Sequence, residues 1–210
     1  MVPVPEREPI AFARPSIGPE EEAAVLKVLR SGWLTTAGEA ESFEREFAAA
    51  VGSTHAIAVN SATSGLHLAL EALGIAPGDR VAMSPFTFTA SAEVCRYVGA
   101  EPLFVDIEED GFLLDPEALD SALGEPVTAG DNGVRAVMPV HIAGSPCSME
   151  RIKDLAESHR LAVVEDAAHA FPLRTTGGTI GTLGDVGVYS FYATKTITTG
   201  EGGMAVTDNE

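Results

Sequence analysis

Hydrophobic and polar positions follow two alternating patterns along this chain. Short runs such as LAVV at 161–164 are apolar at consecutive positions, which is typical of β-strands covered on both faces. Longer segments between these runs have helical spacing; in residues 39–51, Phe43, Phe47 and Val51 lie four apart and form one apolar stripe. The alternation predicts an α/β fold, a three-layer sandwich around a mostly parallel sheet.

The predicted strands cover residues 55–59, 80–84, 102–106, 135–140, 161–165, 186–191 and 203–207. The predicted helices between them cover residues 39–51, 64–73, 89–98, 116–123 and 148–160. A further helix begins within GPEEE at 18–22, because proline suits a first helical turn and acidic side chains suit its positive end. Gly32 is predicted to end that helix.

The first residues form an arm punctuated by Pro3, Pro5, Pro9 and Pro15. No long linker interrupts the chain after this arm, so residues 1–210 are predicted to be one large domain with an N-terminal arm. The chain stops at a polar cluster, residues 208–210, directly after the last predicted strand. This ending favours the interpretation that the sequence has been cut short.

Composition and charge narrow the class of protein. The chain is 45% hydrophobic and 21% charged, which is typical of globular proteins, and it has neither a secretion signal nor an apolar run long enough to span a membrane. We therefore expect a cytoplasmic protein. The formal charge of -18 disfavours nucleic acid and anionic membrane surfaces as partners. Cys95 and Cys147 lie far apart without a CxxC motif, which predicts buried free thiols and no metal site.

Candidate chemistry follows four of the predicted strands, where ligands bind in parallel sheets. Residues 60–65 (NSATSG) place small hydroxyl residues at a helix N-terminus, which suits either an anion such as phosphate or ordinary helix capping. Asp166 and His169 follow the strand at 161–165. A structural partner for the carboxylate and a structural role for the histidine are the alternatives to a binding role.

The other two positions carry a lysine and an aromatic ring. Lys195 follows the strand at 186–191 among small residues and glycines, and a lysine amine with a lowered pKa is a nucleophile toward carbonyl groups. Phe88 follows the strand at 80–84; taken alone, it is most simply explained by core packing. A phosphate cradle, a carboxylate, an aromatic face and a lysine are together the groups that hold pyridoxal 5′-phosphate, abbreviated PLP.

Six sequence blocks resemble the DegT/DnrJ/EryC1/StrS family of PLP-dependent, fold-type I nucleotide-sugar aminotransferases. They are GWLTTAGEAESFEREFA (32–48), NSATSGLHLALEALGI (60–75), SPFTFTASAEV (84–94), PVHIAGSPCSMERI (139–152), VVEDAAHAF (163–171) and SFYATKTITTGEGGM (190–204). The blocks run almost from end to end of the chain in the family's order. EDAAHA and the lysine block with TTGEGG are the most specific of them.

The resemblance implies a role for each matching residue. Lys195 would form the Schiff base with the cofactor and carry protons, and Asp166 would pair with the pyridine nitrogen. His169 would lie near the ring oxygen or the Schiff base, and Phe88 would stack on the ring. The remaining matches are Ala62, Thr63 and Ser190 for the cofactor phosphate, and Trp33 and Thr35 for the sugar substrate.

The resemblance also implies substrates and partners. The amino donor would be an amino acid, by resemblance glutamate, and the acceptor a keto nucleotide-sugar in amino-sugar or polysaccharide biosynthesis. The enzyme would be a homodimer with shared active sites, and a smaller C-terminal domain would follow residue 210. Two positions depart from the family pattern: Ala62 stands where glycine is common, and Thr196 where asparagine is frequent.

Three other functions were weighed against this one. Related PLP-dependent sugar dehydratases have histidine at the lysine position, and Lys195 argues against them. A catalytically incomplete binding or scaffold fragment is a second alternative, because the family's C-terminal domain is absent. A dinucleotide-dependent dehydrogenase would fit the α/β alternation, but the NSATSG loop after the first strand is not a GxGxxG loop.

Overall fold

The computed structural model describes residues 10–124 and 132–210, which form two compact units. The first unit ends at Thr35 and contains the helix α1 (Pro19–Ser31), which begins and ends at the predicted residues. Gly32 follows it with a φ of 73°, the left-handed conformation that glycine adopts without strain. Pro3, Pro5 and Pro9 of the predicted arm lie outside the described residues.

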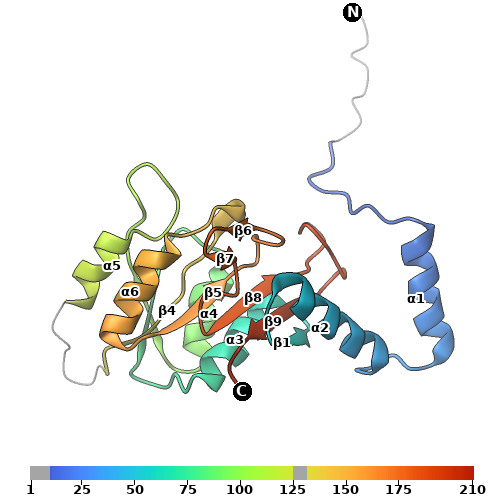
Figure 1. Ribbon diagram of the computed structural model, residues 1–210, viewed down its shortest axis with the longest axis horizontal. Helices are drawn as coiled ribbons and strands as arrows, with labels where there is room; N and C mark the ends of the chain where they lie inside the picture. The colour runs from blue at the N-terminus through green and yellow to red at the C-terminus, as the bar shows by residue number, and fades with distance from the viewer. Residues whose placement is uncertain (1–9, 125–131) are drawn as a thin grey trace, which may run out of the picture. The chain divides into compact units, whose positions relative to one another are not determined.

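The second unit, Thr36–Glu210, is built on a seven-stranded sheet (Figure 1). The strands lie in the order β1 (His55–Val59), β9 (Gly203–Thr207), β8 (Val186–Ser190), β5 (Ala162–Asp166), β4 (Val134–Val137), β2 (Arg80–Met83) and β3 (Glu101–Phe104). From β8 to β3 all neighbouring strands are parallel, whereas β9 is antiparallel to both β8 and β1. The predicted mostly parallel sheet is confirmed.

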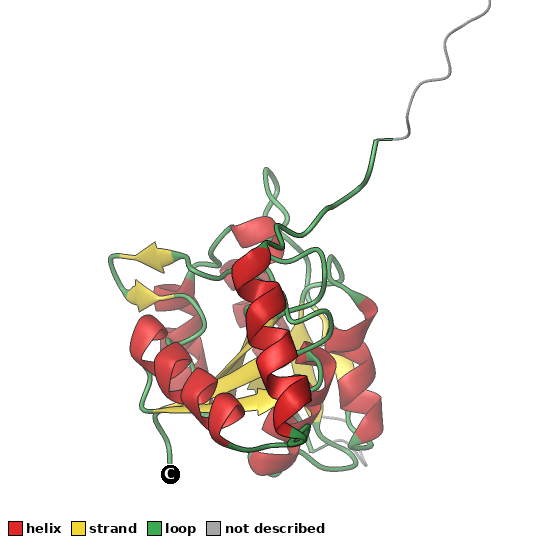
Figure 2. Cartoon of the chain, turned by 90° about the vertical axis from the view of Figure 1, so that its right-hand side faces the viewer, coloured by secondary structure: helices red, strands yellow, loops and turns green. Residues whose placement is uncertain are grey.

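Helices cover both faces of this sheet, as the predicted three-layer sandwich requires (Figure 2). One face carries α3 (Ala62–Ala72) and α4 (Thr89–Tyr97); the other carries α2 (Gly38–Val51), α5 (Pro116–Leu123) and α6 (Met149–His159). Successive strand residues point to opposite faces. Val81 and Met83 therefore pack under α3 and α4, while Ala82 between them packs in the core on the α6 side.

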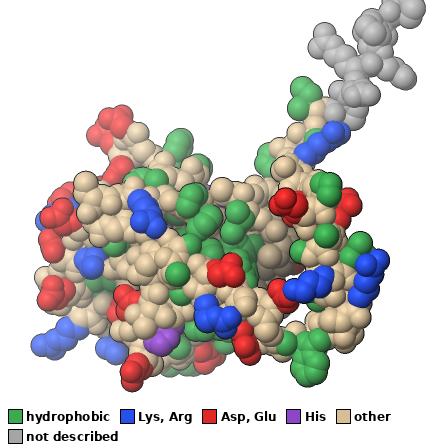
Figure 3. Space-filling model, turned by 45° about the vertical axis from the view of Figure 1, so that its right-hand side comes forward, with side chains coloured by type: hydrophobic (Ala, Val, Ile, Leu, Met, Phe, Trp, Pro, Cys, Tyr) green, Lys and Arg blue, Asp and Glu red, His purple; other side chains and the backbone are tan. Residues whose placement is uncertain are grey.

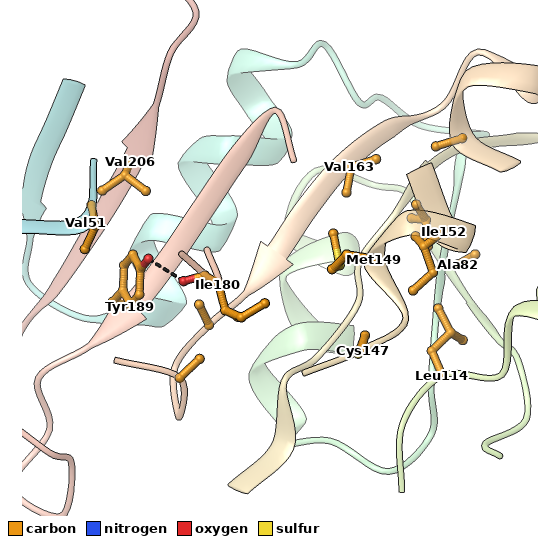
Figure 4. Close-up of a cluster of buried hydrophobic side chains, with 14 of the residues drawn as sticks. Val51, Ala82, Leu114, Cys147, Met149, Ile152, Val163, Ile180, Tyr189 and Val206 are labelled. Carbon is orange, nitrogen blue, oxygen red and sulfur yellow. Dashed lines mark hydrogen bonds between the residues drawn. The ribbon is translucent and has the colours of Figure 1, made fainter. Parts of the chain in front are cut away.

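The core on the α2 and α6 side contains the largest fully buried side chain of the described residues, Tyr189 (Figure 4). Its hydroxyl donates a hydrogen bond to the carbonyl oxygen of Ile180, so the polar end of the ring is satisfied inside the core. Burial raises the pKa of this hydroxyl. Tyr189 thereby anchors β8 one residue before Ser190, where the strand ends.

Two local features were not predicted from the sequence. A two-stranded hairpin, β6 (Arg174–Thr175) and β7 (Gly178–Thr179), comes between β5 and β8 along the chain and forms a sheet of its own. A short 3₁₀ turn, η1 (Ile142–Gly144), follows β4. Strands of two residues are too short to carry a hydrophobic alternation, which explains why the sequence pattern misses them.

The cysteines and the surface agree with the sequence analysis. Cys95 and Cys147 are buried and free, and burial raises the pKa of both thiols to about 12, which keeps them protonated at neutral pH. On the face drawn in Figure 3, acidic and basic side chains are interspersed. Within the described ranges, no helix has the length and apolar character needed to cross a membrane.

Candidate active site

The loop that carries Lys195 joins β8 to β9 and is closed by its own hydrogen bonds. The carbonyl oxygen of Phe191 accepts bonds from Thr199 N (3.0 Å) and Thr198 Oγ1 (2.9 Å). Lys195 N donates to the carbonyl oxygen of Tyr192 at 2.9 Å. These bonds fold the glycine-rich segment back onto the end of β8 and hold the lysine backbone in place.

A cavity of about 260 Å³ lies beside this loop. Its lining residues are Ala143, Ala168, His169, Phe171, Ser190, Thr194, Lys195, Thr196 and Ile197. Three of the predicted site residues, His169, Ser190 and Lys195, therefore meet in one cavity although they come from three different segments. The lining is contributed by Ala143 of η1, the last residue of β8 and the loops that follow β5 and β8, at the edge where the parallel-sheet rule predicts a ligand.

Lys195 is partly buried, and its environment shifts its titration. Desolvation lowers the pKa of its amine below the usual 10.5, and the negative charge of Asp166 opposes this shift. As a result, a larger fraction of the Lys195 amine is neutral at a given pH than in an exposed lysine. Because only a neutral amine attacks a carbonyl group, the cavity favours the nucleophilic form of this side chain.

His169 lies at the rim of the cavity in a defined tautomer. Its Nδ1 accepts a hydrogen bond from the backbone N–H of Ala143 at 3.1 Å, so the proton of the neutral ring is on Nε2. Desolvation lowers the pKa of His169; the charge of Lys195 lowers it further, and Asp166 opposes both. Nε2–H is therefore the donor that His169 offers to a ligand.

Asp166 ends β5 and is held from two sides. It is 5% exposed, and its Oδ2 accepts a hydrogen bond of 2.7 Å from the hydroxyl of Ser91 on α4. Its Oδ1 accepts one of 3.2 Å from the backbone N–H of Ala168. The carboxylate acts electrostatically on both Lys195 and His169, which places its charge within reach of the cavity.

The N-terminus of α3 carries the groups that the sequence predicts to bind an anion. The Ser61 hydroxyl oxygen accepts a hydrogen bond from Ser64 N at 3.1 Å, so part of this segment is an ordinary cap. The backbone N–H groups of Ala62 and Thr63 have no acceptor among the described residues. Ser61 therefore caps the helix, and the next two N–H groups stay available; the phosphate role of Ala62 and Thr63 stays a prediction.

Gly203 brings the predicted phosphate groups together. This residue pairs with Val59 on one side and with Ser190 on the other, so Ser190 lies close to the start of α3. A Cβ atom at position 203 would lie only 2.7 Å from Ala62 N. The absence of a side chain there lets the helix N-terminus and β8 approach each other closely.

Phe88 lies in the second unit, whereas the predicted substrate residues lie in the first. Phe88 is the residue before α4 and its side chain is 73% exposed, so the core-packing alternative is excluded. Ser91, in the first turn of α4, links this segment to Asp166. Trp33 and Thr35 belong to the first unit, and their assignment to the sugar substrate stays a prediction.

Sequence reasoning missed several residues that support the site. Thr87 and Ser91 connect α4 to Asp166, and His141 and Glu165 form a buried pair one residue away from it. Thr87 precedes α4, so its four-residue spacing from Ser91 is not the spacing of one helix face and gives no signal. The contact of Ala143 with His169 carries no signal either, because it uses only the backbone of Ala143.

The donor set fits PLP at each of its polar groups. Two free N–H groups and the hydroxyls of Thr63 and Ser190 suit a phosphate, a buried carboxylate suits a pyridine nitrogen, and a desolvated lysine suits an aldehyde. No residue of the set conflicts with the cofactor chemically.

We expect Lys195 to react with an acylating reagent at lower pH than an unstructured lysine peptide, because its lowered pKa leaves more neutral amine. The rates would be measured by mass spectrometry on cofactor-free protein with the peptide as internal reference. Asp166→Asn removes a charge that raises the pKa of Lys195, so this variant should react at still lower pH. If Lys195 and the peptide reacted over the same pH range, this account of the lysine environment would be wrong. It would also be wrong if Asp166→Asn moved the reaction of Lys195 to higher pH.

Comparison with known proteins adds an independent line of evidence. The model of the DegT/DnrJ/EryC1/StrS aminotransferase family matches residues 15–210. The spore coat polysaccharide biosynthesis protein SpsC of Bacillus subtilis is 46% identical over 201 residues, which are 96% of this chain and 50% of SpsC. This chain thus spans about half the length of that relative.

Solved structures give the same result. The aminotransferase from Psychrobacter cryohalolentis is 38% identical with a TM-score of 0.87, covering 94% of this chain and 49% of its own. Spr1654 from Streptococcus pneumoniae, assigned as a sugar aminotransferase and solved in its PLP form, is 32% identical with a TM-score of 0.88. The match covers 96% of this chain and 53% of Spr1654. The sandwich described above is the fold of these enzymes.

Proposed function

The chain belongs to the DegT/DnrJ/EryC1/StrS aminotransferase family, whose cofactor is PLP, and we propose that it is the cofactor-binding portion of a sugar aminotransferase. The observation that carries this proposal is the cavity that joins Lys195, His169 and Ser190, with the charge of Asp166 acting on it. The enzyme would move an amino group from an amino acid to a keto group on a nucleotide-linked sugar.

The phosphate of the cofactor would be held at the N-terminus of α3. The backbone N–H groups of Ala62 and Thr63 point their partial positive charge at this position, and the hydroxyls of Thr63 and Ser190 add donors. These local donors counter the overall charge of -18, which otherwise repels anions.

The remaining residues would hold and use the ring. Phe88 would cover one face, Asp166 would accept a hydrogen bond from the ring nitrogen, and the Nε2–H of His169 would donate to the ring oxygen. When bound, PLP supplies an aldehyde that condenses with amines and a ring that withdraws electrons. Asp166 supports that withdrawal, because a nearby carboxylate favours the protonated ring nitrogen.

Lys195 would have two tasks. Its neutral amine would attach the cofactor covalently, and the amino donor would then displace it. The freed amine would act as the general base and acid, moving a proton between the α-carbon of the donor and the C4′ carbon of the cofactor. Its partly buried position suits both tasks, since the lowered pKa brings the amine closer to the working pH.

The substrates and the assembly are part of the proposal. We infer glutamate as donor and a keto nucleotide-sugar as acceptor, with Trp33 and Thr35 near the sugar. The names of two relatives, a polysaccharide biosynthesis protein and a sugar aminotransferase, support a sugar as the acceptor. We also infer a homodimer with shared active sites, which is what the family resemblance implies.

A substrate panel tests the function. Full-length protein loaded with PLP would be incubated with glutamate and a series of nucleotide-sugars that carry a keto group at different carbons. With at least one acceptor we expect 2-oxoglutarate and an amino-sugar to form in equal amounts. Mass spectrometry would measure both products. Loss of water from the sugar without consumption of glutamate would instead indicate the dehydratase alternative. Lack of any turnover together with normal PLP binding would favour a binding fragment.

A further inference from the structure

The carboxylate of Asp166 is oriented by a residue that does not itself line the cavity. Ser91 is fully buried, and its hydroxyl lies 2.7 Å from Asp166 Oδ2. A carboxylate oxygen can only accept, so the hydroxyl proton of Ser91 must point at Asp166. The contact joins α4 to the end of β5 across 75 residues of sequence.

Thr87 fixes the direction of this contact. Its Oγ1 lies 2.7 Å from the Oγ of Ser91. Because the single hydroxyl proton of Ser91 is given to Asp166, Thr87 has to donate to Ser91. The result is a one-way chain of hydrogen bonds from Thr87 through Ser91 to Asp166. Thr87 lies directly before Phe88, so these hydrogen bonds start in the segment that carries the aromatic ring.

The two hydrogen bonds to Asp166 define its geometry. Ser91 holds Oδ2 and the backbone N–H of Ala168 holds Oδ1, so rotation of the carboxylate breaks at least one bond. Each carboxylate oxygen has a second lone-pair direction that these bonds leave open. The chain therefore presents a carboxylate in one orientation with remaining acceptor capacity.

We propose that Ser91, itself held by Thr87, is a positioning residue that orients Asp166 toward the ring nitrogen of PLP. The proposal rests on the proposed function, because it assigns the ring nitrogen to Asp166. It adds that the hydroxyls of Thr87 and Ser91 link the Phe88 segment to Asp166. The positions of the aromatic ring and of the carboxylate therefore depend on each other.

The test compares two cofactors in the full-length protein. One is PLP, and the other is its analogue with a C–H group in place of the ring nitrogen, which offers nothing for Asp166 to bind. Removing a group that orients a metal ligand typically costs about 10- to 100-fold in affinity, and we take the lower end of that range for a carboxylate that binds a ring nitrogen. We therefore expect Ser91→Ala to raise the Kd for PLP by about 10-fold and to leave the Kd for the analogue unchanged.

Two further variants make the result specific. Thr87→Val keeps the branched shape but removes the donor to Ser91, and should give a smaller loss that is again confined to PLP. Cys95→Ala changes the same buried face of α4 one turn later, where the thiol donates to the carbonyl oxygen of Ser91 and does not touch Asp166. It should affect neither cofactor. Because Thr87 is only half-buried, its variant tests the proposal even where Ser91→Ala folds poorly.

Each outcome decides between separate claims. If Ser91→Ala and Thr87→Val lost affinity equally for PLP and for the analogue, the positioning role would be wrong. It would also be wrong if neither variant lost affinity for PLP. The proposed function would be intact in both cases. Failure of the unsubstituted protein to bind either cofactor would overturn the proposed function itself. A loss confined to PLP supports both.

Discussion

Replacing Lys195 with alanine is expected to abolish the visible absorbance that PLP acquires on binding and to reduce turnover by roughly 10³-fold or more, since the same amine is both nucleophile and general base. The physical basis is the position of the amine: it is one of three lysines in the chain and the one that lines the cavity. Absorbance spectra of the loaded protein measure the first effect, and formation of 2-oxoglutarate measures the second.

Lys153 offers a matched control for this prediction. It lies exposed on α6, away from the cavity lining, so Lys153→Ala should retain both the absorbance and the turnover. Reduction with borohydride followed by peptide mapping locates the attachment point directly. A cofactor adduct on Lys195 in the unsubstituted protein is expected; an adduct that persists in Lys195→Ala, on another lysine, would refute the assignment.

The sequence predicted Ser190 and Lys195, which line the cavity, and Asp166, whose charge acts on Lys195, because these residues follow strands. Asp166, Ser190 and Lys195 lie at or just after the ends of two parallel strands, and the apolar runs before them identify those strands. The rule that ligands bind at this edge of a parallel sheet then places all three together. Their chemical roles came from the family resemblance, which the match over residues 15–210 confirms at the level of the family.

Other features depend on contacts that no local pattern carries. The antiparallel insertion of β9 between β1 and β8 follows from how the chain folds back after Lys195, and an apolar run reads the same in either direction. The hydrogen bond between Ser91 and Asp166 joins residues 75 apart. Thr87 precedes α4 and Ser91 lies in its first turn, so no helical stripe joins the two, and their common partner is set by the tertiary fold.

Strand alternation explains why two adjacent acidic residues have different tasks. Val163 and Val164 pack in cores on opposite faces of the sheet, and the two following residues continue that alternation. Asp166 consequently meets Ser91 on α4, whereas Glu165 meets His141 and the segment 181–184 on the other face. One carboxylate is left with acceptor capacity toward the cavity, and the other is saturated inside the protein.

Glu165 is the hub of that second network. It is fully buried; its Oε1 accepts from Leu183 N and Gly184 N at 2.6 Å each, and its Oε2 accepts from Gly181 N at 2.8 Å. His141 Nε2 lies 3.0 Å from Oε2. Because Nδ1 of this histidine accepts from Cys147 N at 3.1 Å, its ring proton is on Nε2 and points at Glu165.

Replacing Glu165 with alanine is therefore expected to lower the free energy of unfolding by about 3 to 5 kcal/mol, the cost of breaking a buried charged network. Three backbone N–H groups would lose their acceptor at once, and each unsatisfied buried donor costs about 1 to 3 kcal/mol. Urea unfolding followed by circular dichroism measures the change. A cost of this size is a large fraction of the stability of a typical domain, so the urea midpoint should fall clearly.

Two variants separate the hydrogen-bonding role from simple loss of volume. Glu165→Gln keeps the size of the side chain but turns an amide NH₂ toward either pair of donors, so most of the destabilisation should remain; full recovery would mean that only packing matters. Glu117→Ala removes an exposed ion pair with Arg151, 2.9 Å long, and should cost less than about 1 kcal/mol. If Glu165→Ala cost no more than this surface variant, the network could not be what holds the 181–184 segment against β5. The orientation of Asp166 would then depend on its own hydrogen bonds to Ser91 and Ala168.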